Sequence, residues 1–175
     1  MANLLFSPSG RIGPSAFLKG MGIVAVVSAL FHLFMFKGIV WGYGMMFLAF
    51  VLLFYPMLAL LIKRLHDSGK SGWLGLLFLI LMVVIYFIIT SFIGGMFAKD
   101  EALVFQEAML ELQGNVVTPE EQFAIMGEAG DPYAKKLAIP VALLAAVSIM
   151  LGAFLVNLIL KQDAHENQYG HPPAA

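Results

Sequence analysis

The sequence contains no cysteine and few charged residues. Lys, Arg, Asp and Glu make up 12% of its 175 residues, about half the share in an ordinary soluble domain. Hydrophobic residues make up 61%, more than a small soluble domain can place in its interior. The lack of cysteine excludes disulfides, thiolate metal sites and iron–sulfur clusters. A soluble enzyme, a disulfide-stabilised scaffold and a disordered chain are therefore excluded. A net charge of −1 with no basic stripe also argues against a nucleic-acid partner.

The apolar residues are concentrated in continuous runs. A helix needs about 20 apolar residues to cross a hydrocarbon core of about 30 Å, and strands of a membrane barrel would alternate in polarity instead. We therefore predict an all-α fold, an integral membrane four-helix bundle that forms a single membrane domain over residues 1–175. The four expected spans are residues 17–36, 41–62, 73–97 and 137–160.

The distribution of Lys and Arg predicts the orientation, because cytoplasmic segments carry more of them. The N-terminal segment, the loop over 63–72 and the tail after residue 160 lie on one side and carry six of these residues. The opposite side carries four. Both termini are therefore expected in the cytoplasm. The six are Arg11, Lys19, Lys63, Arg64, Lys70 and Lys161; the four are Lys37, Lys99, Lys135 and Lys136.

The loop over 98–136 is expected to be an extracytoplasmic insertion with short amphipathic helices on the outer surface. It holds eight acidic residues. Asp100 is a candidate cap for a helix over about 101–113, which Gly114 would end. Phe105, Met109 and Leu112 share one face of that helix, and we expect them to contact a partner.

A second short helix is expected over about 119–126. Thr118, Pro119 and Glu121 form the sequence pattern of a capping box, with proline at the first helical position. Asp131 and Pro132 repeat the cap-and-proline signal before the last span.

The turn over 64–73 is the densest group of polar residues, and two interpretations of it are open. In the first, it binds an anionic headgroup or ligand. Arg64 and Lys70 would clamp a phosphate, His66 and Asp67 would form a proton pair, and Trp73 would lie at the membrane interface. Arg11, on the same side, could join them. In the second, the segment anchors the topology and forms a tight turn at Gly69 and Gly72, with Asp67 or Ser71 capping the next helix.

Other polar residues give weaker signals, so no cofactor and no metal is expected. His32 near the end of the first span lacks the further features of a haem site. His165 and His171 with Asp163 and Glu166 could form a metal site only if the tail brought them together. The spans hold no acidic residue, which argues against a proton-coupled transporter or an ion channel. Asn157 is expected to form a hydrogen bond between helices.

Several short motifs together resemble the DUF805 family, a group of small multi-span bacterial inner-membrane proteins of unknown function. They are Gly10-Arg11-Ile12, Arg64-Leu65-His66-Asp67, Gly69, Ser71-Gly72-Trp73 and Asn167-Gln168-Tyr169-Gly170. The resemblance implies a four-helix protein of the bacterial inner membrane with cytoplasmic termini. It implies no activity.

The sequence departs from the usual pattern of that family at three places. Gly13-Pro14-Ser15 stands where members usually have another basic residue. The tail ends in His171-Pro172-Pro173 instead of a Pro-Asp-Pro-like sequence. The acidic loop over 98–136 is an insertion relative to typical members.

Three functions remain, in decreasing order of support. The first is a non-enzymatic structural or accessory protein that packs against a partner in a larger membrane protein complex. The second is a component that binds or transports anionic lipids or small molecules through the basic turn. The third, a lipid enzyme, has only His66 and Asp67 beside Ser68 or Ser71 to support it, and adjacent residues in a turn rarely point at one another.

Overall fold

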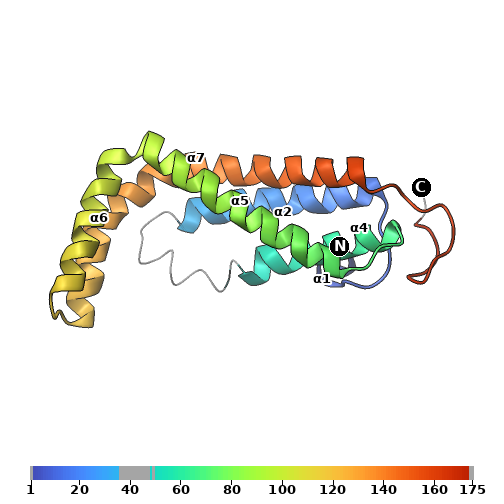
Figure 1. Ribbon diagram of the computed structural model, residues 1–175, viewed down its shortest axis with the longest axis horizontal. Helices are drawn as coiled ribbons and strands as arrows, with labels where there is room; N and C mark the ends of the chain where they lie inside the picture. Colours follow the sequence, from blue (N-terminus) through green and yellow to red (C-terminus); the bar gives the residue numbers. More distant parts are fainter. Residues whose placement is uncertain (1, 36–47, 49, 174–175) are drawn as a thin grey trace.

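The computed structural model describes residues 2–35, 48 and 50–173, and it is built from helices (Figure 1). Of the second expected span, residues 41–47 and 49 lie outside the described residues. The elements in chain order are α1 (Ala2–Phe6), α2 (Pro14–Met35), the π-helix η1 (Phe50–Phe54), α4 (Tyr55–Asp67), α5 (Trp73–Phe97), α6 (Lys99–Gly114) and α7 (Pro119–Ile159).

Three of the described helices, α2, α5 and α7, are long and apolar enough to cross a membrane. The described part of the second expected span is η1 followed by α4. Pro56 lies in the first turn of α4, where its missing N–H removes no hydrogen bond within that helix. The π-helix η1 runs directly into α4, and such a single π-turn next to an α-helix is a rare local irregularity of the helical hydrogen-bond pattern.

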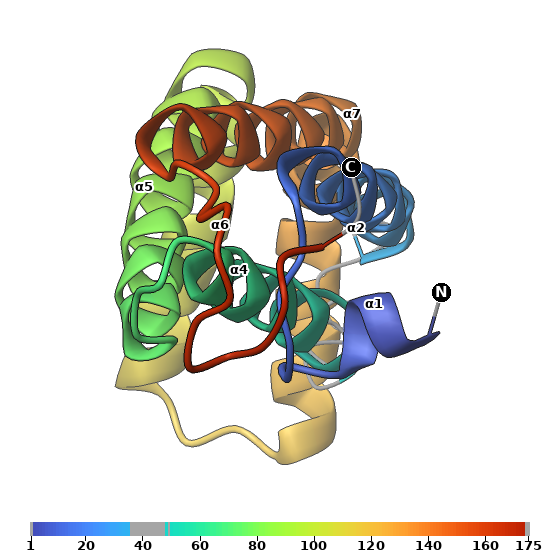
Figure 2. The ribbon, with the colours of Figure 1, turned by 90° about the vertical axis from the view of Figure 1, so that its right-hand side faces the viewer.

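Helix α1, the α4–α5 turn and the segment after α7 lie at one end of the molecule (Figure 1), which faces the viewer in Figure 2 and which we call the tail end. Just inside the tail end, α2, α4, α5 and α7 share one apolar core. Phe17 and Leu60 are fully buried there, and Val156 contributes from the last turn of α7. This core holds the helix ends that carry the polar motifs in a defined arrangement.

Helix α7 is one continuous helix of 41 residues, about 60 Å long. The predicted capping box at Thr118 is confirmed, with both of its hydrogen bonds to Glu121 present. The prediction of a separate short helix over 119–126 is wrong, because α7 continues without a break from Pro119. The prediction of a helix start at Asp131 is wrong for the same reason. Pro132 lies inside α7, as does Pro140, because an interior proline removes one hydrogen bond and bends a helix without ending it when packing holds both halves.

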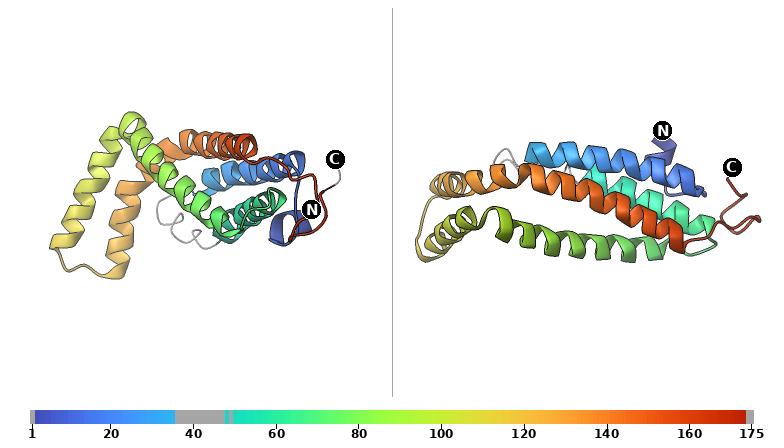
Figure 3. Two further views of the ribbon diagram at one scale, coloured as in Figure 1. Left: turned by 45° about the vertical axis from the view of Figure 1, so that its right-hand side comes forward. Right: turned by 90° about the horizontal axis from the view of Figure 1, so that it is seen from above.

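The first part of α7 turns away from the rest and lies beside α6 (Figure 3). Together α6 and residues 119–136 form a helical hairpin at the end opposite the tail end. Lys136 of α7 donates to Glu101 of α6 at 2.7 Å, and the Phe105 ring stacks on Tyr133 with 6.3 Å between centroids. Asp100 is not the cap of α6. The helix begins one residue earlier, at Lys99, so Asp100 lies inside its first turn, where its charge favours the helix dipole.

Gly20 allows α2 to approach α4, and its replacement tests this packing. A Cβ at Gly20 would lie 2.6 Å from a methyl carbon of the buried Leu60. We expect Gly20→Ala to destabilise the protein by about 1–3 kcal/mol, because the core has no room to yield. Thermal unfolding in detergent measures this change.

Gly22→Ala on the same helix is the matched control. Its added methyl would meet nothing closer than Met150 Sδ at 4.0 Å, so the higher helix propensity of alanine should leave stability equal or slightly increased. Equal melting temperatures for the two variants would contradict the close approach.

Candidate functional site

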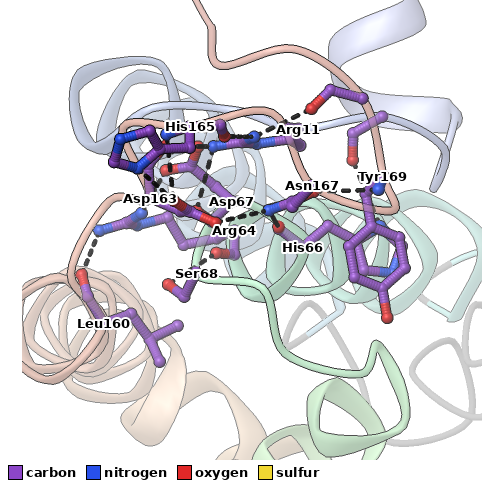
Figure 4. A network of polar contacts seen from close by, with 12 residues as sticks. Arg11, Arg64, His66, Asp67, Ser68, Leu160, Asp163, His165, Asn167 and Tyr169 are labelled. Carbon is purple, nitrogen blue, oxygen red and sulfur yellow. Dashed lines mark hydrogen bonds and ion pairs between the residues drawn. The ribbon is translucent and has the colours of Figure 1, made fainter.

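The tail end contains a network of charged side chains and backbone carbonyls that joins four separate segments (Figure 4). Arg11 comes from the link between α1 and α2. Arg64, His66 and Asp67 come from the last turn of α4, and Asn157 from the last turn of α7. The tail after α7 folds back over them and contributes residues 163–170.

Arg64 is buried, with 1% of its surface exposed, and all three of its nitrogen groups donate hydrogen bonds. Nη1 donates to Asp67 Oδ2 at 2.6 Å, Nε donates to Asn157 Oδ1 at 2.8 Å, and Nη2 donates to the Leu160 carbonyl. Asn157 also donates to the Pro14 carbonyl at 3.1 Å. Arg64 therefore joins the end of α4 to the end of α7, and the predicted interhelical hydrogen bond of Asn157 is confirmed.

Arg11 approaches the other oxygen of the same carboxylate. Its Nη2 and Nε lie 3.2 and 3.3 Å from Asp67 Oδ1. Its Nη1 donates to the carbonyls of His165 at 2.8 Å and Gly170 at 3.0 Å, and its Nη2 donates to the carbonyl of Asp163. The Asp67 carboxylate, with no exposed surface, thus receives two guanidinium groups, and Arg11 holds the tail by its main chain.

His66 and the tail motif form the outer side of this network. The His66 ring stacks on Tyr169 with 3.7 Å between centroids, and its Nδ1 lies 3.3 Å from the Gly10 carbonyl. Asn167 donates to the His66 carbonyl at 3.1 Å and accepts from the Tyr169 amide at 2.9 Å. Gly170 has a φ of +116°, a conformation that other residues rarely adopt, and its turn brings its carbonyl to Arg11.

Burial sets the direction of most pKa shifts here. Burial raises the pKa of Asp67 above its ordinary value, and the guanidinium groups of Arg11 and Arg64 oppose that rise. Burial also lowers the pKa of His66, which favours the neutral imidazole. The pKa of Asp163 is lowered because its carboxylate accepts from the His165 amide and from Asn167. Neutral His66 and ionised Asp163 are thus the forms that suit the docked tail.

The structure brings together only part of the predicted anion site. Arg11 and Arg64 meet, but their donors bind Asp67 and carbonyls instead of a phosphate. His66 and Asp67 do not form a proton pair, since His66 contacts Gly10 and Tyr169. Lys70 and Trp73 lie outside the network and are exposed. The Arg64–Asp67 part of the turn therefore serves as an internal anchor.

Two smaller predictions about this turn are wrong. Of the two predicted caps of α5, Asp67 is wrong because the two arginines hold its carboxylate. Ser71 Oγ accepts from the Trp73 amide at 3.4 Å, although the N-cap position itself is Gly72. Gly69 has the expected positive φ of +68°, but Gly72 does not. Gly72 is needed for space, since a Cβ there would lie 2.9 Å from Ile62 and 3.0 Å from His66.

The remaining candidate residues lie elsewhere. Phe105, Met109 and Leu112 are half-buried, on the face of α6 that meets α7 at Tyr133. His32 has both ring nitrogens in hydrogen bonds, to the Ser28 carbonyl and to the Tyr86 hydroxyl. The tail histidines form two separate pairs, His165 with Asp163 at 3.8 Å and His171 with Glu166 at 3.3 Å.

Asp163, Asn167 and Tyr169 contribute to the network but were absent from the predicted site. Asn167 and Tyr169 were visible in the sequence as part of the tail motif. Their contacts with α4 were not, because about one hundred residues separate them from His66.

The helices and this network define an all-helical integral membrane protein whose tail is docked on its helix ends. The chain belongs to the DUF805 family, described as proteins of unknown function, and the match covers residues 5–171. No curated protein and no solved structure matches the chain. The matched range includes all four segments that meet at the tail end, and the network contains motif residues from three of them, namely Arg11, Arg64 to Asp67, and Asn167 to Gly170.

Replacing Asp67 tests the network. In Asp67→Asn two buried guanidinium groups lose their shared carboxylate, and we expect a loss of about 3–5 kcal/mol of stability, the usual cost of breaking a buried ion pair. Thermal or denaturant unfolding in detergent measures it. Glu166→Gln, which breaks an exposed pair in the same tail, should cost at most about 1 kcal/mol. Equal losses of stability in both variants would show that the Asp67 carboxylate contributes no more than an exposed ion pair.

The docking of the tail should weaken as the pH falls. The folded-state pKa of His66 is lowered, so its contribution is complete above the unfolded pKa of about 6.5 and is lost as the pH falls below that value. The Asp163 amide, which donates to the Asp67 carbonyl at 2.9 Å, reports docking by hydrogen exchange. Its protection should be constant from about pH 7.5 to about pH 6.5 and fall below that value.

His66→Phe provides the control for this pH dependence. A phenyl ring can still stack on Tyr169 but cannot take up a proton. Protection of the Asp163 amide in this variant should change little over the same pH range once the intrinsic exchange rate is corrected. An unchanged pH response would assign the effect to another group.

Proposed function

We propose that this protein is a non-enzymatic accessory protein of the bacterial inner membrane that packs against another membrane protein through its α6–α7 hairpin. The observation that carries the proposal is the charge of the hairpin. Between Asp100 and Asp131 it holds eight carboxylates and no Lys or Arg. Such a surface is repelled by anionic headgroups and is complementary to a basic surface of a protein.

The hairpin also exposes apolar side chains away from its own packing face. Phe105 stacks on Tyr133 of α7, and Met109 and Leu112 lie half-buried on the same face of α6, so we place the partner surface on the other faces instead of on these three residues. Leu103 and Leu110, seven residues apart, share the outward face of α6, and both are about half exposed. Apolar side chains bordered by carboxylates are a common composition of protein contact surfaces.

The course of the chain supports four spans and cytoplasmic termini. Helix α2 runs away from the tail end and α4 runs back to it, so the chain returns between Met35 and Asp67 (Figure 1). With a crossing over 41–62, the number of spans is even and both termini lie on the side with more Lys and Arg. The hairpin is then extracytoplasmic.

Site-specific cross-linking tests the proposed partner surface. The chain lacks cysteine, so Leu110→Cys offers a unique site for a photoreactive maleimide in native membranes. We expect one discrete heteromeric product. Adding Glu107→Lys and Glu111→Lys to the same variant should reduce its yield by about tenfold, because charge reversal replaces attraction by repulsion.

Leu77→Cys is the matched control, since this leucine of α5 is also exposed but lies in a predicted span. It should give no product of the same mass. A yield from Leu110→Cys that does not exceed that of the control, or that is insensitive to the charge reversal, would count against the hairpin as the contact surface.

A further inference from the structure

A pocket of about 460 Å³ lies at the tail end, between the last turns of α4 and the start of α5. Its size falls within the range of known small-molecule sites. It lies beside the Arg64–Asp67 network and shares only His66 and Tyr169 with it. Its lining residues are Leu58, Ile62, His66, Ser71, Gly72, Trp73, Leu76 and Tyr169.

The lining is divided in a way that matches an amphiphile. Leu58 and Ile62 on α4 and Leu76 on α5 form an apolar part, one to three turns from the helix ends. His66, Ser71 and Tyr169 form a polar part at the ends themselves. The apolar part therefore faces the depth of the acyl chains, and the polar part faces the depth of the headgroups.

The pocket borders the exposed surface of α5. Most residues of helix α5 are exposed or half-buried, and only Gly75, Leu79 and Gly94 are buried, so in a membrane its exposed surface contacts acyl chains. Trp73, at the first position of α5, is 78% exposed beside the pocket, and tryptophan favours the interface between headgroups and hydrocarbon. A lipid of the adjacent leaflet can thus enter the pocket sideways without crossing the protein.

The turn that borders the pocket carries a positive charge. The two buried arginines are offset by Asp67 and by Asp163, so the network contributes little net charge. Lys70, directly before Ser71 in the turn, is exposed and has no side-chain partner among the residues that the structure describes. The first turn of α5 adds the positive end of a 25-residue helix.

We infer that this pocket binds the headgroup and upper acyl chain of an anionic phospholipid. Lys70 attracts the phosphate, Ser71 offers a hydroxyl at the headgroup depth, and Trp73 packs along the lipid. The docked tail completes the site, because Tyr169 forms one wall while it stacks on His66 at 3.7 Å. The anion therefore binds beside the guanidinium network and not within it.

Quenching of Trp73 by brominated lipids tests this inference. In a Trp41→Phe background Trp73 is the only tryptophan. The protein is placed in phosphatidylcholine vesicles that contain either phosphatidylglycerol or phosphatidylcholine brominated on the upper acyl chain. We expect phosphatidylglycerol to be enriched at Trp73 by roughly fivefold, the preference that one well-placed lysine provides.

Two variants and their controls separate the pocket from general surface charge. Lys70→Gln should reduce the enrichment to about onefold, whereas Lys161→Gln, an exposed lysine at the same end, should leave it unchanged. Ser71→Leu keeps the charge but fills the mouth of the pocket, and it should also abolish the enrichment. Protection of the Asp163 amide confirms that each variant keeps its tail docked.

Three results would overturn the inference. The first is equal quenching by the two brominated lipids in the parent protein. The second is an equal loss in Lys70→Gln and Lys161→Gln, which would indicate a diffuse surface effect. The third is loss of the enrichment on addition of soluble glycerol phosphate, which would identify a site for a free phosphate compound instead of a membrane lipid.

Discussion

The shared carboxylate of Asp67 is the interaction on which the tail end of this structure depends. A guanidinium group removed from water is costly unless it is paired and hydrogen-bonded. Arg64 meets both conditions, through Asp67, Asn157 and the Leu160 carbonyl. Because Asp67 also binds Arg11, the charge requirement of one helix end determines where the N-terminal link and the tail must lie.

The need to pair Asp67 with both arginines explains why the segments that carry the family resemblance meet in space although they lie far apart in the chain. Gly10 and Gly170 provide positive-φ turns on either side of Arg11, and the tail offers it three carbonyls. The motif is thus a docking device made of complementary parts. Each part taken alone resembles a basic turn or a polar tail, and its role depends on the other parts.

The opposite end of the molecule, the α6–α7 hairpin, has no comparable buried charge network among the described residues. The contacts of the hairpin include the ion pair between Glu101 and Lys136 and the stack of Phe105 on Tyr133, and the hairpin carries a large excess of negative charge. Its sign and its distance from the tail end separate it from the lysine-bearing turn. The two proposed partners, a basic protein surface and an anionic lipid, therefore belong to opposite ends of the molecule.

Local patterns in the sequence determined the membrane class, the all-helical fold, the capping box at Thr118 and the boundaries of α5 almost to the residue. Each depends on hydrophobic runs or on hydrogen bonds between residues a few positions apart. Tertiary structure alone decided the partners of Arg11 and Arg64, the exposure of Lys70 and the continuity of α7 through Pro132. A buried charge takes its partner from whichever segment the fold brings near, and a proline ends a helix only where packing does not hold both halves. Neither condition can be evaluated from neighbours in the sequence.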